Sequence, residues 1–265
     1  VITIHDVLFL KHGRRRLENI IFKPWARLIG SRAAVVLTDS EHSRRDLVTL
    51  LGIDPDGIAV VPLGVSEQFS PEMRDKAPDA LVRLGIPQNY ILTVTNFRPH
   101  KNGDLLIRAY ARVAERIPDT VLVLAGTRTH DSDSLRESAE RLGIGDRVLM
   151  PGLISDEDLP ALYAGARVFA FPSLDEGFGL PVLEAMASGV PVVSSSTSSL
   201  PEVVGDAGRM LAPTDEEAWA EAIFDLSTDV SVRQQRIQAG LKRVKAFTWR
   251  RSVSMLLDIL EGVAR

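Results

Sequence analysis

Short runs of aliphatic and β-branched residues alternate with amphipathic segments along almost the whole chain. The apolar runs are typical of strands buried on both faces of a parallel sheet, and they occur at residues 1–4, 34–37, 58–61, 90–94, 120–124, 168–171 and 190–193. Between them, apolar positions recur at helical spacing, as in residues 105–113 and 135–142. Ser40 and Ser155 each have the position of a helix N-cap. This alternation predicts an α/β fold with parallel sheets and right-handed crossovers.

A proline-rich stretch at residues 62–87 separates two series of predicted strands and helices. The first series, residues 1–83, has too few strands to close a Rossmann-like sheet, whereas the second, residues 84–248, is long enough for a complete one. An amphipathic helix is predicted at residues 249–265. Because residues 1–4 form a strand pattern with no polar residue before it, we expect the sequence to begin inside a domain of a longer protein.

The charge and the cysteine content exclude several classes of site. The 31 basic and 35 acidic side chains give a net charge of −4, which argues against a nucleic-acid partner held by net charge. The absence of cysteine excludes disulfides and thiolate metal sites, and it fits a reducing cytoplasm. No apolar run approaches the length of a membrane span.

Two cations, Arg98 and Lys101, stand in the segment that follows the predicted strand at 90–94. In open α/β sheets, ligands bind at the carboxyl ends of the strands, where helix N-termini offer free N–H groups. Arg98 as a planar fork and Lys101 as a point charge could together hold a diphosphate. A solvated basic loop explains the same two residues equally well.

A glycine-containing segment follows the predicted strand at 168–171. Gly177 and Gly179 allow the backbone to approach a ligand closely. Pro181 has the position of the first turn of a helix. Anionic oxygens could therefore meet the backbone N–H groups of Phe178, Gly179 and Leu180. The alternative is an ordinary tight turn.

Three further polar residues are candidates for contacts with a sugar. Glu176 and Glu184 lie eight residues apart, and an ionised carboxylate can accept hydrogen bonds from paired sugar hydroxyls. Glu184 could also be an ordinary surface residue. His5 ends the first predicted strand, where an imidazole can orient or polarise a substrate near neutral pH. A hydrogen-bonded structural histidine is the alternative for His5.

The patterns that resemble metal-ligand sets have simpler explanations. D-x-D patterns occur at residues 54–56 and 131–133, but the first lies in a predicted turn and the second at a predicted helix start. The five histidines show no spacing typical of metal ligands. We therefore predict no metal site.

Four blocks of sequence together resemble glycosyltransferase family four, the retaining enzymes of the GT-B fold. The blocks are Ser-Glu-His-Ser-Arg-Arg-Asp-Leu at 40–47, Val-Val-Pro-Leu-Gly-Val at 60–65, Arg-Pro-His-Lys-Asn at 98–102, and the run 176–193, which contains the family's two glutamates separated by seven residues. The resemblance covers essentially the whole chain. It implies an α/β GT-B architecture of two Rossmann-like domains, the N-terminal one incomplete: an acceptor-side domain at 1–83, a nucleotide-sugar (donor) binding domain at 84–248, and a helix at 249–265 that packs back toward the N-terminal domain.

The resemblance also implies roles for single residues. Arg98 and Lys101 would hold the donor diphosphate and stabilise charge on the leaving group, and Glu184 would bind the ribose hydroxyls. Glu176 would position the donor sugar and phosphates, together with backbone N–H groups of Phe178, Gly179 and Leu180. His5 would face the reacting sugar carbon from the acceptor side. The implied catalytic set is therefore His5, Arg98, Lys101 and Glu176.

The implied activity is transfer of a hexose of the mannose or glucose type from a GDP- or UDP-linked donor to a glycan or lipid-linked acceptor. The family retains the anomeric configuration and uses neither a bound metal nor a cofactor. Because family members begin earlier in sequence, we hypothesise that the isolated chain binds the donor but transfers poorly. The alternatives are a non-catalytic sugar-nucleotide binding fragment that needs a partner chain, and a nucleotide-sugar epimerase of GT-B fold, which the 176–184 block fits less well.

A basic segment at residues 11–32 carries seven cations against one acid, with Phe22 and Trp25 among them. The cations are Lys11, Arg14, Arg15, Arg16, Lys23, Arg27 and Arg32. Such a patch could contact anionic lipid at the inner face of the plasma membrane, where many acceptors of this family reside. A solvated surface helix is the favoured alternative.

Overall fold

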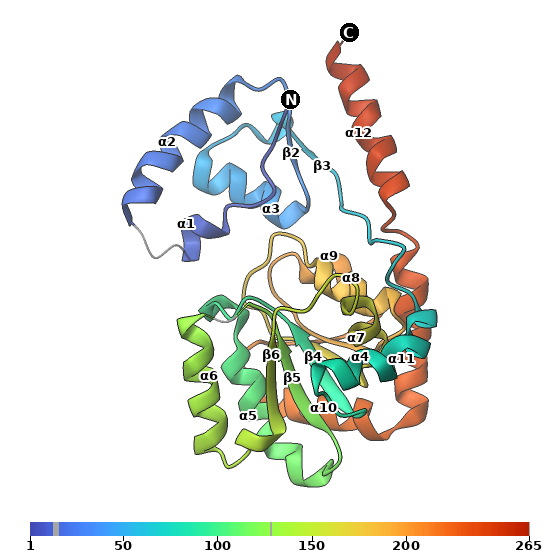
Figure 1. The fold of residues 1–265 in the computed structure, drawn as a ribbon. Coiled ribbons are helices and arrows are strands. Elements are labelled where there is room, and N and C mark those ends of the chain that lie inside the picture. Colours follow the sequence, from blue (N-terminus) through green and yellow to red (C-terminus); the bar gives the residue numbers. More distant parts are fainter. Residues whose placement is uncertain (13–15, 128, 265) are drawn as a thin grey trace.

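The computed structural model describes residues 1–12, 16–127 and 129–264. Two parallel sheets confirm the predicted α/β class, and each sheet has its own apolar core (Figure 1). We refer to the two parts as the N-terminal unit (residues 1–60) and the C-terminal unit (residues 66–247).

The N-terminal unit contains a three-stranded sheet in the order β1-β2-β3. Its core consists of Val7, Ala26, Val36, Leu47, Leu51, Ile53 and Ile58. Ser40 is an N-cap, as predicted, because its side chain accepts a hydrogen bond from the Ser43 N–H. The elements are β1 (Ile2–Thr3), α1 (Leu8–His12), α2 (Arg16–Arg32), β2 (Val36–Thr38), α3 (Glu41–Asp46), a π-helical turn (Leu47–Leu51), a 3-10 turn (Pro55–Gly57) and β3 (Ile58–Val60).

The C-terminal unit contains a six-stranded parallel sheet in the order β6-β5-β4-β7-β8-β9. Helices α4, α7, α8 and α9 pack on one face, and α5, α6 and α10 pack on the other. The strands are β4 (Tyr90–Val94), β5 (Val121–Ala125), β6 (Val148–Gly152), β7 (Val168–Phe171), β8 (Val192–Ser195) and β9 (Arg209–Leu211). The helices are α4 (Ala77–Leu84), α5 (Gly103–Val113), α6 (His130–Arg141), α7 (Leu159–Gly165), α8 (Leu180–Ala187), α9 (Leu200–Val204), α10 (Glu216–Thr228) and α11 (Val230–Val244).

All seven predicted strands are present, although several are shifted by one or two residues. Two strands were missed: β6, which contains Pro151 and Gly152, and β9, which is three residues long and lies at the sheet edge. The predicted capping contacts of Ser155 are present. Its hydroxyl accepts from the Asp158 N–H at 3.1 Å, and its carbonyl accepts from the Leu159 N–H at 3.0 Å. Residues 156–158 form a turn, however, and α7 itself begins at Leu159.

The strand order of the larger sheet reverses between β4 and β7. From β4 the chain adds β5 and then β6 toward one edge, whereas β7, β8 and β9 extend toward the other. At such a reversal, the connections that leave neighbouring strands diverge to opposite faces and open a crevice at the carboxyl ends. The loops after β4 and β7 are the two loops that the sequence singled out for ligand binding.

The chain enters the C-terminal unit at Val65 and leaves it toward α12 at Thr248, and these two segments lie side by side. Val65 forms a parallel bridge with Thr248, and its N–H donates to the Phe247 carbonyl at 3.1 Å. The backbones are so close at Gly64 that a Cβ there would lie 2.2 Å from the Trp249 nitrogen. A cavity of about 390 Å³ separates the units beside this junction, lined by residues that include Asp39, Phe178, Arg243 and Met255.

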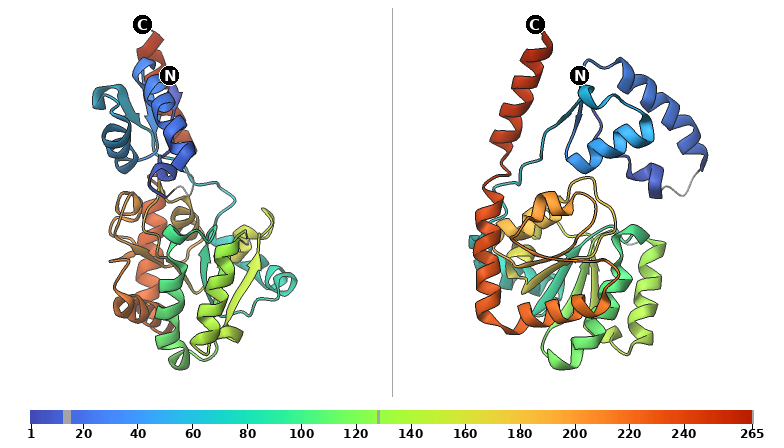
Figure 2. Two further views of the ribbon diagram at one scale, coloured as in Figure 1. Left: turned by 90° about the vertical axis from the view of Figure 1, so that its left-hand side faces the viewer. Right: turned by 180° about the vertical axis from the view of Figure 1, so that it is seen from behind.

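Helix α12 (Trp249–Ala264) leaves this junction and rises beside the N-terminal unit (Figures 1 and 2). Its first turn is joined to the incoming chain, because the Ser252 hydroxyl donates to the Pro62 carbonyl at 2.5 Å. One stripe of the helix remains exposed: Trp249, Val253, Leu257, Leu260 and Val263. The described residues form no helix with the length and apolar character to cross a bilayer.

Candidate functional site

The loops after β4 and β7 are fastened together at the crevice. The Leu174 N–H donates to the His100 carbonyl at 2.7 Å, and the Ser173 hydroxyl donates to the same carbonyl at 3.2 Å. The Asn102 amide donates to the carbonyls of Pro172 and Pro213, at 3.2 and 2.9 Å. The two predicted ligand-binding loops therefore form one surface.

An ion pair joins these loops at their centre. The Lys101 Nζ lies 2.6 Å from the Glu176 Oε1, and the two side chains are only 14% and 10% exposed. Arg98, by contrast, is exposed and forms no ion pair within the described residues. The structure thus brings Lys101 and Glu176 into contact and leaves the Arg98 guanidinium accessible to an anion.

The backbone next to Arg98 has an unusual conformation. Phe97 has a φ of 56°, a left-handed value that costs a bulky residue about 1–3 kcal/mol. Its ring is buried in the core on the α5 face of the sheet, and this packing holds the turn in place. Residues in strained conformations cluster at functional sites, which supports a role for this loop in binding.

His100 is a neutral structural residue between the cations. Burial, together with the nearby charge of Lys101, His12 and Arg98, lowers the pKa of His100 to about 4. Its ring stacks on that of His12 with centroids 4.7 Å apart. His100 is therefore uncharged at neutral pH and serves to pack the loop.

The start of α8 presents free backbone donors to the same crevice. Gly179 precedes the helix with a φ of 115°, a value that few residues other than glycine adopt. Among the described residues, no acceptor pairs with the N–H groups of Phe178, Gly179 and Leu180. The Phe178 side chain is buried and that of Leu180 is half-buried. Free N–H groups at a helix start form a ready site for an anion.

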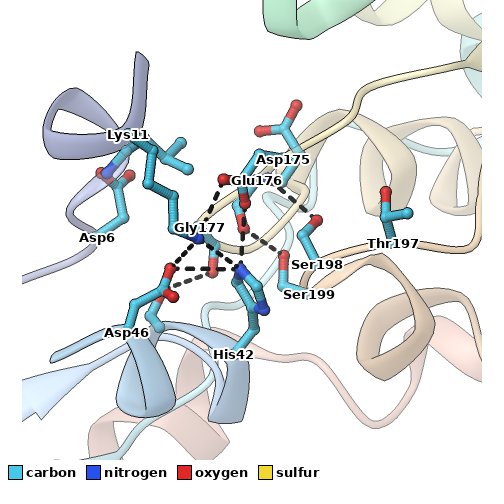
Figure 3. A network of polar contacts seen from close by, with 12 residues as sticks. Asp6, Lys11, His42, Asp46, Asp175, Glu176, Gly177, Thr197, Ser198 and Ser199 are labelled. Atoms are coloured by element: carbon cyan, nitrogen blue, oxygen red, sulfur yellow. Dashed lines mark hydrogen bonds and ion pairs between the residues drawn. The ribbon is translucent and has the colours of Figure 1, made fainter. Parts of the chain in front are cut away.

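A serine-rich loop after β8 holds this segment in position. The Ser199 hydroxyl donates to the carbonyls of Glu176 and Phe178, at 3.0 and 2.8 Å. The Ser198 hydroxyl accepts from the Glu176 N–H at 3.1 Å (Figure 3). Neither residue was predicted, although several serines directly after a predicted strand were an available signal. The backbone donors are therefore fixed before any ligand binds.

Glu184 lies in the second turn of α8 and is half-buried. Burial raises the pKa of this carboxyl, and the nearby Tyr163 hydroxyl only partly offsets the effect. A carboxylate that folding disfavours in this way, beside a crevice, is typical of a functional position.

His5 lies two residues after β1 in the N-terminal unit. Its Nδ1 lies 2.9 and 3.1 Å from the two carboxylate oxygens of Asp39, while 66% of its side chain is exposed. Burial raises the pKa of Asp39, although the contact with His5 opposes this shift. Asp39 thus fixes one ring nitrogen of His5 and leaves the other free. Sequence analysis did not identify Asp39, because it lies 34 positions away.

The N-terminal unit contacts the loop after β7 directly. The hydroxyls of Ser40 and Ser43 both donate to the Gly177 carbonyl, at 2.6 and 3.0 Å. A Cβ at Gly177 would lie 2.7 Å from a carboxylate oxygen of Asp6, so that only glycine fits. The N–H groups of Glu41 and His42, at the start of α3, each donate to the carboxylate of Glu202 in α9 at 2.8 Å.

A polar cluster that the sequence did not predict lies beside these contacts (Figure 3). Asp175 meets Lys11, His12 and His42 at distances of 3.0–3.1 Å, and the Lys11 Nζ also lies 2.5 Å from Asp46. Ligand atoms of His42, Asp46 and Asp175 are within 4.8 Å of one another, a grouping that could hold a metal ion. Here the Lys11 ammonium lies among them, so that the cluster already contains a positive charge.

Two family models match parts of this chain. A family model described as "Glycosyl transferases group 1" matches residues 82–243, and one described as "Glycosyltransferase Family 4" matches residues 1–69. The first match contains Arg98, Lys101, Glu176 and Glu184, and the second contains His5.

Relatives of known name include two kinds of glycosyltransferase. O-antigen chain mannosyltransferase B of Escherichia coli is 36% identical over 231 residues, which are 85% of this chain and 60% of the relative. D-inositol 3-phosphate glycosyltransferase of Salinispora tropica is 34% identical over 264 residues, which are 91% of this chain and 55% of the relative. The chain therefore spans a little more than half of the length of these relatives.

Solved structures confirm the GT-B fold. Sucrose-phosphate synthase from Thermosynechococcus elongatus superposes with a TM-score of 0.80 at 25% identity, covering 98% of this chain and 67% of that one. HepE from Anabaena, in complex with UDP and glucose, superposes with a TM-score of 0.82 at 21% identity, covering 99% and 71%.

Proposed function

Because the chain belongs to the group 1 glycosyl transferases, we propose that it is the donor-binding part of a retaining hexosyltransferase. The donor is a GDP- or UDP-linked hexose of the mannose or glucose type, and the acceptor is a glycan or a lipid-linked saccharide. The observation that carries this proposal is the Lys101–Glu176 pair, which joins the two loops at the reversal point of the sheet, with the free N–H groups at the start of α8 in the same segment as Glu176. The Escherichia coli mannosyltransferase and the UDP and glucose in the Anabaena complex favour this donor class.

The residues of the crevice match the parts of such a donor. Lys101 and Arg98 provide charge for the diphosphate, and the N–H groups at the start of α8 provide hydrogen bonds. Glu184 accepts hydrogen bonds from the ribose hydroxyls, and Glu176 accepts them from the hexose. His5 approaches the reacting carbon from the opposite side of the cleft.

The proposed chemistry depends on charge that is already in place. When the bond between the anomeric carbon and the diphosphate oxygen breaks, the electron pair leaves with the diphosphate. Lys101, Arg98 and the α8 start lie where this negative charge develops. Donors that are fixed in advance by Ser198 and Ser199 stabilise it without reorganisation at the moment of reaction.

Titration of the chain with GDP, UDP, ADP and their sugars by calorimetry tests the donor assignment, together with a Glu184→Gln variant. We expect saturable binding of one nucleotide and a loss of about 10- to 100-fold in its affinity in the variant, because a hydrogen bond to a charged group is lost. The same variant should melt at a higher temperature at neutral pH. Burial raises the pKa of Glu184 in the folded chain, so its ionised form weakens folding above its unfolded pKa, and Gln removes that penalty.

Glu137→Gln, on the exposed face of α6, is the matched control and should change neither quantity. If every nucleotide bound equally weakly and without saturation, the donor assignment would be contradicted. Unchanged affinity in Glu184→Gln, beside normal binding by the parent chain, would remove Glu184 from the ribose site.

We further propose that α2 contacts an anionic membrane at the cytoplasmic face of the plasma membrane. Phe22, Trp25 and Leu28 are 38%, 58% and 49% exposed on this helix, and Lys23, Arg27 and Arg32 lie on it as well. Aromatic and basic residues on one exposed helix favour the headgroup region of anionic lipid. Two members of the predicted patch, Arg14 and Arg15, lie outside the described residues, and Lys11 points into the polar cluster instead.

Flotation with vesicles that contain anionic lipid tests the membrane contact. Trp25→Ala combined with Lys23→Glu and Arg32→Glu should reduce the bound fraction several-fold, as should reversal of Arg14, Arg15 and Arg16. Reversal of Arg136 and Arg141 on α6 is the control and should leave flotation unchanged. Equal flotation of all variants would show that α2 is a solvated surface helix.

A further inference from the structure

Three side chains of the N-terminal unit converge on one carboxylate in the loop after β7. Asp175 is 7% exposed, and it meets the Lys11 Nζ, the His12 Nε2 and the His42 Nε2 at 3.1, 3.0 and 3.1 Å. Lys11 and His12 belong to α1. His42 belongs to α3, and Asp175 lies in the loop after β7 (Figure 3). The proposed binding of the donor uses none of these four residues.

The charges in this cluster are shielded from water. The side chains of Lys11, Asp46 and Asp175 are 26%, 15% and 10% exposed, so salt screens them less than it screens pairs at the surface. Burial alone would raise the pKa of Asp175, but hydrogen bonds from His42, His12 and Lys11 hold this pKa well below its usual range. Asp175 is therefore negatively charged, and each of its three partners belongs to the N-terminal unit.

Asp175 is covalently joined to Glu176, which faces the donor crevice. Ser198 and Ser199, in the loop after β8 of the C-terminal unit, form hydrogen bonds with the N–H and the carbonyl of Glu176. The next residue is bound from the other unit, since the hydroxyls of Ser40 and Ser43 donate to the Gly177 carbonyl. The segment 175–177 is thus held by both units, and any separation of the units pulls directly on the residue that pairs with Lys101.

We propose that Asp175 is a positioning residue, whose contacts with Lys11, His12 and His42 tie the loop after β7 to the N-terminal unit and orient Glu176 toward the donor sugar. The proposal rests on the proposed function, because it assigns the sugar contact to Glu176. The nucleotide and the diphosphate meet residues of the C-terminal unit alone, namely Arg98, Lys101, Glu184 and the α8 start. We call the contacts of Asp175 with Lys11, His12 and His42 the clamp. The clamp therefore affects binding of the sugar and not binding of the nucleotide.

Comparing the affinity for a nucleoside diphosphate with the affinity for the corresponding nucleotide sugar distinguishes the diphosphate site from the sugar site. Asp175→Asn keeps the shape of the side chain and removes its charge. We expect the affinity for the nucleotide sugar to fall about tenfold, while the affinity for the free nucleotide diphosphate stays within twofold. Lys11→Met should reproduce this pattern, and Asp175→Asn should add little in the Lys11→Met background, because both changes break one network.

Asp225→Asn is the matched control. Asp225 pairs with Arg209 at 2.7 Å within the C-terminal unit and away from the cleft, so its loss should alter neither affinity. Equal losses for diphosphate and sugar in both Asp175→Asn and Lys11→Met would overturn the proposal, since they would show a general structural role. Wild-type affinity for the sugar in both variants would overturn it as well.

A distance measurement tests the clamp without any ligand. The chain has no cysteine, so Arg32→Cys on α2 and Arg136→Cys on α6 would carry the only two spin labels. We expect Asp175→Asn to broaden the distance distribution and shift it to longer values, whereas an unchanged distribution would overturn the clamp. Failure of the parent chain to bind any nucleotide would instead count against the proposed function, and the two failures are thereby distinguished.

Discussion

Replacement of Lys101 by methionine should lower the affinity of the chain for a nucleoside diphosphate by about 100-fold or more. Lys101 is the cation fixed at the centre of the crevice, 2.6 Å from Glu176 and largely shielded from water. Its removal has two effects. The diphosphate loses a charge-assisted contact, and the Glu176 carboxylate, now unpaired, repels the ligand. Calorimetric titration of the variant with UDP and GDP measures the loss.

A second substitution separates these two effects. In Lys101→Met combined with Glu176→Gln, the repulsion is absent, so we expect part of the diphosphate affinity to return, to within about tenfold of the parent chain. Lys242→Met, an exposed position on α11, is the matched control. Parent-like binding by Lys101→Met would show that the diphosphate lies elsewhere, and an equal loss in the single and double variants would show that Glu176 exerts no repulsion.

Gly64→Ala should destabilise the chain more than any substitution discussed above, by at least about 3 kcal/mol. The new Cβ would lie 2.2 Å from the Trp249 nitrogen and 2.6 Å from the Thr248 carbonyl carbon. Both atoms belong to the backbone, which cannot rotate away as a side chain can. The segments at Val65 and Thr248 would have to separate, with loss of the bridge between them. Urea denaturation followed by circular dichroism measures the change in the free energy of unfolding.

Gly57→Ala provides the comparison for this prediction. A Cβ at Gly57 meets nothing within 4 Å, so its effect should be below about 1 kcal/mol. Equal stability of the two variants would mean that the segments at Val65 and Thr248 do not pack closely in solution. A loss confined to Gly64→Ala, with donor binding retained, would locate the damage at the junction and not in the crevice.

The strands and the ligand-binding loops were predictable because their signals are local. Buried parallel strands are continuous apolar runs, and a cation or a glycine directly after such a run falls at the carboxyl edge of the sheet. The strands that escaped are those in which this signal is weak. In β6 a proline and a glycine interrupt the apolar run, and β9 contains Arg209 and is only three residues long.

Contacts between the units were not predictable, because they join residues that are remote in sequence. His12 and Asp175 are 163 positions apart, and His42 and Asp175 are 133 positions apart. The sequence around each of these residues does not indicate its contact partner, because the partner is determined by how one unit packs on the other. Lys11 illustrates the consequence: composition grouped it with a basic surface patch, whereas the fold turns it toward two carboxylates.

The chain enters and leaves the C-terminal unit at the same place, the bridge between Val65 and Thr248, so the backbone permits the parts of the molecule to rotate about this point. Entry and exit at one place leave rotation about that point as the easiest relative motion, whereas entry and exit at separate places would resist it. Helix α12 extends 16 residues from this pivot, or about 24 Å at 1.5 Å per residue. A rotation of about 10° there would carry its far end about 4 Å, so a change of a few degrees at the crevice becomes a displacement of atomic size at the end of the helix.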